Sequence, residues 1–233
     1  MMFFRLLLLW VCSGVAFAEE AAVPQAVNSP VHQGVSSYYK ATGKGQCSFD
    51  ANPKDLMVAA VNRRDYNKAA LCGAYLRVKG SKGEVVVRVV DGCPGCKAGG
   101  LDLSKQAFAQ VADLRKGRER TTWQIESPPL ATPVQYRFKK GSSAYWAGVQ
   151  ILNHRNPIAK LEYQKEDGTW GVVSRTAYNY FVQNKPSMGA GPYTFRVTDY
   201  YGNTLIDKNI PLKSGVLIAG AQQFPDPTIA QNP

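Results

Sequence analysis

The stretch Val89–Ser104, VVDGCPGCKAGGLDLS, decides the fold because it joins a strand pattern to a glycine-rich loop. The run EVVVRVVD, which leads into it, alternates in the manner of a β-strand and places Val85, Val87 and Val89 on one face. The loop that follows holds a CxxC pair and four glycines, with Asp91 before them and Asp102 after them. Three interpretations fit this composition: a redox dithiol, half of a zinc site, or the frame of a carbohydrate cleft.

The compartment of the protein separates these interpretations. Residues 1–18, MMFFRLLLLWVCSGVAFA, combine one Arg, an apolar run and a small-residue A-x-A end, which is the pattern of a secretory signal peptide. The apolar run is shorter than the roughly 18–20 residues that span a bilayer. We therefore predict cleavage after residue 18, a secreted extracellular protein, and no membrane association of the mature chain.

Export favours disulfides for the four cysteines that remain once Cys12 leaves with the signal peptide. A redox dithiol normally sits at a helix N-terminus, but here a glycine loop separates the CxxC from the next helix pattern. A zinc site would need a second ligand pair, whereas the other two cysteines are single and both histidines are isolated. We expect no metal or cofactor. Four cysteines allow three connectivities, of which we favour Cys93–Cys96 with Cys47–Cys72.

The remaining pattern divides the chain. Short strands alternate up to residue 126, with one helix predicted behind Ser104 as N-cap, and the proline-rich SPPLATP then forms a stiff linker. Beyond it only strands and turns follow, a pattern typical of an immunoglobulin-type β-sandwich. The predicted division is signal peptide 1–18, flexible lead-in 19–33, first domain 34–126, linker 127–133, second domain 134–225 and tail 226–233.

The charge of the chain bears on its partners. The sequence has 28 Lys and Arg against 17 Asp and Glu, a net charge of +11, and the excess is spread over both predicted domains. Outside the cell a spread positive charge favours an anionic matrix such as pectin, teichoic acid or lipopolysaccharide, although solubility alone would also account for it. Nucleic acid is not an expected partner of an exported chain.

The two aspartates of the loop are candidate catalytic groups. An inverting glycosidase needs an acid and a base about 6.5–9.5 Å apart across the sugar, which two aspartates on one loop could provide. The alternative is structural, with Asp91 supporting the loop and Asp102 capping backbone N–H groups. Two isolated histidines leave no Ser/His/Asp or Cys/His nucleophile set.

At this point the residues resemble a known family, the bacterial expansins. The segments GVSSYYKATGKGQCSF, VNRRDYN, VVRVVDGCPGCKAGGLDLSKQAFAQVAD and FKKGSSAYWAGVQILNHRNPIAKLEY carry the resemblance, in order and spacing, over nearly all of residues 34–225. It implies a mainly β protein, with a six-stranded double-psi β-barrel and short helices followed by an immunoglobulin-like cellulose-binding domain.

The resemblance also implies the activity and the partners. A member of this family loosens plant-type cell wall without hydrolysis by disrupting noncovalent contacts between glucans. The expected partners are cellulose and matrix polysaccharides (xyloglucan, pectin) or peptidoglycan, met outside the cell in a plant–microbe setting by a monomer.

Site residues carry over one by one. Asp102 matches the family's indispensable groove aspartate and Asp91 its second groove aspartate, while Ser37 stands where the family usually has Thr, with the hydroxyl kept. Cys93 replaces a groove Tyr of some members, which puts sugar stacking there in doubt. The remaining groove candidates, which could supply an aromatic surface or pack in the core, are Tyr38 and Tyr39.

A second set matches the family's linear aromatic platform in the second domain: Tyr145, Trp146 and Tyr178, with Lys139 beside them. Coplanar aromatics bury the flat apolar ring faces of a crystalline glucan at little ordering cost. Adjacent residues of a regular strand point to opposite faces, so a bulge or strand end must reorient either Tyr145 or Trp146. Pattern alone would make Trp146 a sandwich core residue instead.

Two rival functions remain at this stage. The same barrel occurs in inverting endoglucanases and in peptidoglycan lytic transglycosylases, where Asp102 would be the general acid. Asp91 is the obvious stand-in for the missing base, and we expect that it does not serve as one. The other rival is a cellulose-binding module with a vestigial barrel.

Overall fold

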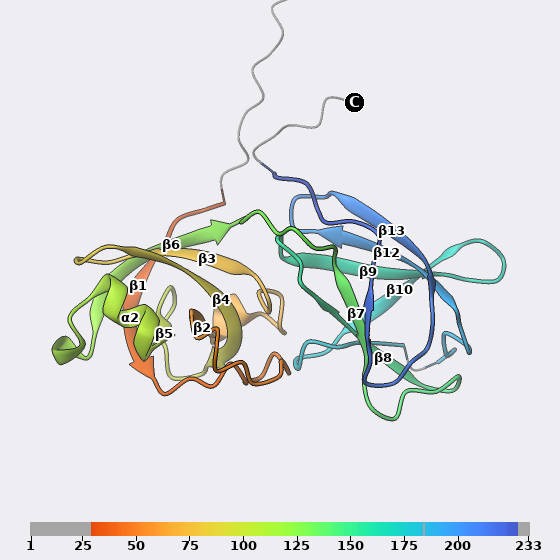
Figure 1. Cartoon of the computed structure of the whole chain (residues 1–233), viewed down its shortest axis with the longest axis horizontal. Coiled ribbons are helices and arrows are strands. Elements are labelled where there is room, and N and C mark those ends of the chain that lie inside the picture. The colour runs from red at the N-terminus through yellow and green to blue at the C-terminus, as the bar shows by residue number, and fades with distance from the viewer. Residues whose placement is uncertain (1–28, 184, 228–233) are drawn as a thin grey trace, which may run out of the picture.

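The computed structural model describes residues 29–183 and 185–227, which form two β domains lying side by side (Figure 1). The predicted signal peptide 1–18 lies outside the described residues, as do most of the lead-in and of the tail. Among the described residues no helix is long and apolar enough to cross a membrane. The predicted fold class is confirmed, with a closed barrel followed by a β-sandwich.

The first domain is a barrel of six strands in the order β1-β5-β2-β4-β3-β6. The β1–β5 and β2–β4 pairs are parallel and the other neighbours antiparallel. The strands are β1 (His32–Tyr39), β2 (Val58–Asn62), β3 (Tyr75–Lys79), β4 (Glu84–Cys93), β5 (Leu101–Ser104) and β6 (Glu119–Glu126); the helical segments are α1 (Arg63–Tyr66), α2 (Lys105–Val111) and the 3-10 turn η1 (Leu114–Lys116).

The barrel core follows the predicted local patterns. Val87 and Val89 of β4 are fully buried, as is Phe108 of α2. The predicted N-cap is confirmed: the Ser104 hydroxyl accepts a hydrogen bond from the Ala107 N–H at 3.1 Å, which satisfies one of the free N–H groups at the helix start.

Two local expectations need correction. Asp102 lies within strand β5 rather than in a loop, because β5 pairs with both β1 and β2. Strand β1 begins at His32, inside the predicted lead-in 19–33. Its first residue pairs with Trp123 of β6, and the two rings stack with centroids 3.9 Å apart.

Both favoured disulfides are present. Cys47–Cys72 is buried in the barrel, and Cys93–Cys96 closes the loop that follows β4. The first bridge closes the longer loop and therefore restricts the unfolded chain more. The CxxC is a structural clasp, as expected of an exported protein.

The second domain has two sheets that share β10, and they pack face to face around an aromatic core. The Tyr136 and Phe195 rings stack across the sandwich with centroids 5.4 Å apart, and Phe138 meets Tyr193 at 5.6 Å. The strand order is β13-β12-β9-β10-β11-β8-β7-β14. Their bounds are β7 (Gln135–Phe138), β8 (Ala147–Leu152), β9 (Ile158–Gln164), β10 (Trp170–Arg175), β11 (Phe181–Gln183), β12 (Tyr193–Asp199), β13 (Thr204–Ile210) and β14 (Leu217–Ala219).

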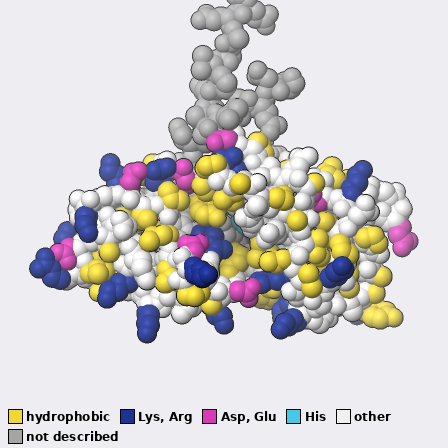
Figure 2. All heavy atoms as spheres, in the orientation of Figure 1, with side chains coloured by type: hydrophobic (Ala, Val, Ile, Leu, Met, Phe, Trp, Pro, Cys, Tyr) yellow, Lys and Arg dark blue, Asp and Glu magenta, His cyan; other side chains and the backbone are white. Residues whose placement is uncertain are grey.

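The two domains are joined by buried hydrogen bonds as well as by the chain. The Cys47 carbonyl of the barrel accepts from Gln150 Nε2 at 2.9 Å and from Asn179 Nδ2 at 3.2 Å. Gln150 is fully buried, and its Oε1 accepts two bonds from Arg137, which in turn binds the Ser48 carbonyl of the barrel at 2.9 Å. These contacts fix the sandwich against the barrel, and Figure 2 shows Lys and Arg side chains on the surface of both domains.

Gln150→Ala is therefore expected to destabilise the protein by about 1–3 kcal/mol, because it leaves the buried Cys47 and Arg137 groups short of partners. Thermal unfolding of the purified mature protein would measure the loss. The matched control is Gln164→Ala at an exposed position, for which a change within about 0.5 kcal/mol is expected. Equal stability of the two variants would contradict this account of the domain interface.

Candidate functional site

Four strands of the barrel carry a row of residues that ties the predicted groove together. Ser37 of β1 pairs with Asp102 of β5, Asp102 pairs with Ala60 of β2, and Ala60 pairs with Asp91 of β4. Directly paired residues share one face of a sheet, so all four side chains lie on the same face. Two strand spacings separate the backbones of the aspartates, a distance of about 9–10 Å.

An irregularity in β4 places Asp91 in this row. Regular alternation would put Asp91 on the same face as Val89, which is fully buried in the core. The register instead shifts by one residue, so that Ala59 pairs with Val89 while Ala60 pairs with Asp91. The extra residue, Val90, turns Asp91 to the opposite face, as bulges beside functional sites often do. The Val90 carbonyl accepts a bond from the Cys47 N–H at 3.2 Å.

Of the two aspartates in the row, Asp102 has its carboxyl hydrogen-bonded to a side chain rather than to the backbone. It is half-buried, and its Oδ1 accepts a bond from the Ser37 hydroxyl at 2.7 Å. Burial raises the pKa of Asp102 above its ordinary value; the bond from Ser37 opposes the rise and the charge of Asp91 adds to it. Asp102 therefore holds its proton to a higher pH than an exposed aspartate.

Asp91 has a different environment. Its Oδ1 accepts bonds from the backbone N–H groups of Gln46, at 2.7 Å, and Gly92, at 2.8 Å. A Cβ at Gly45 would lie 2.4 Å from the Asp91 Cγ, so only glycine fits beside this carboxylate. Asp91 thus anchors the loop before Cys47 to the end of β4 and supplies the second negative charge.

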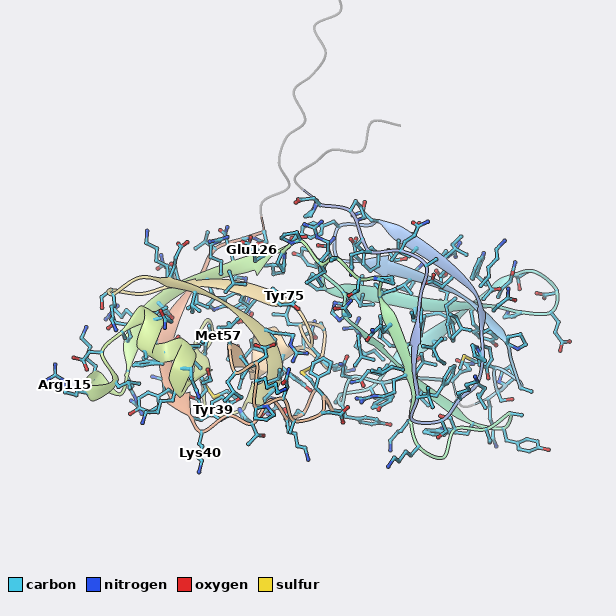
Figure 3. All side chains as sticks on the ribbon, in the orientation of Figure 1. Tyr39, Lys40, Met57, Tyr75, Arg115 and Glu126 are labelled. Carbon is cyan, nitrogen blue, oxygen red and sulfur yellow. A yellow bond between two sulfur atoms is a disulfide. The ribbon has the colours of Figure 1, made fainter. Side chains whose placement is uncertain are left out.

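The two adjacent tyrosines of β1 differ in role. Tyr38 points to the other face, packs against Phe108 with centroids 5.0 Å apart and donates to the Leu114 carbonyl. Tyr39 shares the face of Ser37, and its hydroxyl is buried with no hydrogen-bond partner among the described residues. Burial, reinforced by Asp91 and Asp102, raises the pKa of Tyr39 to about 12. Figure 3 shows Tyr39 beside Lys40 where β1 leaves the barrel.

The platform candidates of the second domain lie at turns. Tyr145 is 87% exposed and sits in a two-residue turn that Ser143 and Trp146 close with a 2.7 Å bond from the Ser143 N–H to the Trp146 carbonyl. This turn provides the reorientation that two adjacent aromatics require. Trp146 is half-buried and stands outside the aromatic core, and its Cη2 lies 3.4 Å from the position that a Cβ on Gly148 would occupy.

The other platform candidates flank this turn. Lys139 places its Cβ beside the same glycine, 3.5 Å from the position of a Cβ there, on the side of β8 that Trp146 covers. Tyr178 is 41% exposed and belongs to the turn between β10 and β11, where its ring lies 5.9 Å from that of Tyr180.

Tyr66 is not among the predicted site residues, yet it connects the groove to the turn that carries Tyr178. Its hydroxyl donates to the Ala177 carbonyl at 2.8 Å, so the turn that carries Tyr178 rests on the barrel. A cleft of about 750 Å³ opens beside this contact, between the end of β4 and the second domain. The signal was the NRRDY segment: Asn62 caps a single helical turn, which alternation patterns do not reveal. The cleft is lined by Gln46, Arg63, Arg64, Tyr66, Asn67, Lys68, Gly92, Cys93, Pro94 and Ala177.

Cys93 lines that cleft and forms the disulfide with Cys96. A disulfide at this position offers a sugar ring no aromatic surface. In the described part of the chain no group of three His, Cys, Asp or Glu side chains could hold a metal ion. The row itself offers two carboxyl groups and a serine hydroxyl, and the buried phenol of Tyr39 lies on the same face.

Known proteins match either the barrel alone or both domains together. A family model described as a lytic transglycolase matches residues 31–123. The chain is 36% identical over 214 residues to the expansin YoaJ of Bacillus subtilis, covering 86% of this chain and 90% of that relative. It is 28% identical over 204 residues to expansin-like protein 2 of Dictyostelium discoideum, of which half is covered.

Solved structures are similar as well. The apo expansin of Clavibacter michiganensis superposes with a TM-score of 0.77 at 36% identity, covering 84% of this chain and 99% of that one. A mutant of the same Clavibacter protein in complex with cellohexaose superposes with a TM-score of 0.78 at 35% identity, with the same coverage.

The raised pKa of Asp102 predicts how its replacement affects stability. A native pKa above the ordinary 3.8 adds stability at pH values below 3.8, and this contribution is lost as the pH rises through the native pKa. Asp102→Asn, which removes the half-buried charge, should therefore unfold at a higher temperature than the parent at pH 7 and at a similar one below pH 3.8. Calorimetric scans across that range would measure the difference.

Asp113→Asn is the matched control with the opposite sign. The Asp113 carboxylate accepts hydrogen bonds from the Arg115 side chain, which lower the pKa of Asp113. Neutralising Asp113 should therefore reduce the stability of the protein at pH 7 rather than raise it. A parent protein that is more stable at pH 7 than Asp102→Asn would show that the Ser37 bond outweighs burial at this site.

Proposed function

The chain belongs to the bacterial expansin family, and from that membership we propose that it is a secreted protein that binds cellulose and loosens plant-type cell wall without hydrolysis. The observation that carries the proposal is the contrast within the row: Asp102 is half-buried and bound to Ser37, whereas Asp91 Oδ1 is occupied by two backbone N–H groups. Such a row can bind a glucan chain, but only one of its two carboxyl groups, that of Asp102, is not held by backbone N–H groups.

The binding step uses the second domain. The exposed rings of Tyr145 and Tyr178 and the half-buried ring of Trp146 supply apolar area for the flat faces of glucose rings. Two of these residues sit in turns held by backbone hydrogen bonds, so little conformational entropy is lost when they engage a flat surface. The complex of the Clavibacter relative with cellohexaose supports a cellulose-type ligand for this chain.

The loosening step uses the barrel. Glucan hydroxyl groups bond to the hydroxyl and ether oxygens of a neighbouring chain, and the Asp102 carboxyl and the Ser37 hydroxyl, side by side on one face, can take the place of these oxygens. A glucan that bonds to this row exchanges chain-to-chain hydrogen bonds for protein bonds. Separation of wall polymers then needs no covalent bond to break.

A second candidate function, polysaccharide cleavage with Asp102 as general acid, is favoured by one observation. A carboxyl whose pKa is raised by burial is typical of the acid in glycosidases, and the lytic transglycolase model covers the barrel. Cleavage by inversion also needs a base that activates water. The Oδ1 of Asp91, in β4, accepts two backbone hydrogen bonds, which disfavours Asp91 in that role.

Wall creep separates the two functions. Added to a clamped, heat-inactivated wall strip, the mature protein should cause extension without releasing reducing ends from soluble glucan, and Asp102→Asn should abolish the extension while cellulose binding stays within about twofold. Reducing ends released by the parent and lost in Asp102→Asn would establish hydrolysis instead. Extension that survives Asp102→Asn but not Trp146→Ala would leave only a binding module.

Gly148 offers a test of the platform that keeps every aromatic residue. The ring of Trp146 covers this glycine, and a Cβ there would be at ordinary contact distance, whereas the γ-methyl groups of valine would push the ring away. Gly148→Val should therefore weaken cellulose binding about tenfold, the value of displacing one buried aromatic contact. Gly148→Ala is the matched control and should bind as the parent does in cellulose pull-down. Equal binding by both variants would remove Trp146 from the platform.

A further inference from the structure

A second cleft, of about 490 Å³, lies beside the α1 segment and shares Arg64, Asn67 and Lys68 with the cleft beside Tyr66. Both domains line it, since it is bounded by β1, β6 and the residues after α1 in the barrel and by the start of β9 and the β12–β13 turn in the sandwich. Its volume is within the range of small-ligand sites. The lining residues are His32, Arg64, Asp65, Asn67, Lys68, Ala70, Leu71, Trp123, Ile125, Pro157, Ile158, Ala159, Arg175 and Tyr200.

Arg175 is the unusual member of this lining because its charge is enclosed without a carboxylate. It lies over the Phe181 ring at 4.8 Å and donates to two backbone carbonyls, Ala69 at 2.9 Å and Ile158. No acidic side chain pairs with it within the described residues. Burial lowers its pKa to about 10. An enclosed cation that lacks an anion is costly, and an anionic ligand in the cleft would offset that cost.

Two more cations face the same space. Arg64 and Lys68 are exposed, and neither forms an ion pair in the part of the chain that the structure describes. The one acidic residue of the lining, Asp65, is already engaged: it accepts a bond from Asn62 and lies 3.6 Å from the Nδ1 of His32. The lining therefore has an excess of positive charge that no protein group neutralises.

The lining also includes apolar side chains and an exposed aromatic ring. Tyr200 is 51% exposed and its ring lies at right angles to that of Tyr201, with the ring centroids 5.3 Å apart. Ile125 and Leu71 are half-buried members of the same wall. A small inorganic anion would use only the cations, whereas a sugar ring that carries a carboxylate would use both the cations and the aromatic face.

We propose that this cleft binds a uronate residue of an acidic polysaccharide, with the carboxylate on Arg64, Lys68 and Arg175 and the ring against Tyr200. The site shares Arg64 and Lys68 with the cleft beside Tyr66 but contains none of the residues of the groove row or of the aromatic platform. It would give the protein a second attachment to the wall, through the acidic matrix rather than through the glucan.

Calorimetric titration of the mature protein with trigalacturonate tests the proposal. The parent should bind trigalacturonate and lose most of that affinity toward the methyl-esterified trimer, which keeps the ring shape but lacks the charge. Arg64→Gln should weaken binding about tenfold, the value of one charge-assisted hydrogen bond, and Tyr200→Ser should weaken it as well. A parallel titration with a glucuronate trimer shows whether the cleft takes the carboxylate of galacturonate, of glucuronate or of both.

Arg63→Gln is the matched control, because Arg63 is the neighbouring exposed cation and lines the groove-side cleft but not this one. It should bind trigalacturonate as the parent does, and all variants should keep parental binding to cellulose. Equal losses in Arg63→Gln and Arg64→Gln, equal binding of the ester, or binding of inorganic phosphate as tight as that of the uronate would each overturn the proposal. Failure of the parent protein to bind cellulose would contradict the proposed function and leave the uronate site untouched.

Discussion

The extra residue in β4 is the constraint on which the groove depends. Without the register shift at Val90, Asp91 would continue the face of Val87 and Val89 and bury a carboxylate in the barrel core. With it, the strand delivers a core side chain at one position and a groove side chain two residues later. The same displacement also sets two contacts with the preceding loop. The Asp91 carboxyl accepts the Gln46 N–H, and the Val90 carbonyl accepts the Cys47 N–H.

The groove is also the place where the fold gives up stability for a functional surface. Asp102 remains half-buried with one hydrogen bond, and the Tyr39 hydroxyl is left without a partner in the described part of the chain. Among the described residues, the other buried side-chain polar atoms have partners: Gln150, for example, uses both ends of its amide. The half-buried Asp102 carboxyl, next to a closed and well-packed barrel, is a group to which a ligand with many hydroxyl groups can donate further hydrogen bonds.

Local sequence patterns predicted correctly those features of the fold that depend on residues close together in the chain. The Ser104 cap and its helix, the burial of Val87 and the pairing of Cys93 with Cys96 all depend on residues a few positions apart. Features set by tertiary pairing could not be predicted in this way, and the position of Asp102 in a strand between β1 and β2 is one of them.

The family resemblance supplied some of what local patterns could not, such as the barrel topology and the roles expected of Asp102 and Trp146. It included the VNRRDYN segment but gave no role to Tyr66, because the contact of Tyr66 with the Ala177 carbonyl forms only when the second domain packs against the barrel. Trp146 shows the same limit. Whether an aromatic residue enters a core depends on what faces it, and here the sandwich is filled by Tyr and Phe rings instead.

The hydrogen bonds at the Cys47 carbonyl have a consequence for which polymers the protein can distinguish. Because they hold the two domains at one mutual angle, the row in the barrel and the aromatics of the sandwich keep a constant separation and direction. Two weak sites at a fixed separation reinforce each other only for a chain stiff enough to run straight from one to the other. Under the proposed function, a rigid, extended glucan would therefore engage both sites together, whereas a coiled or branched glucan would engage them one at a time.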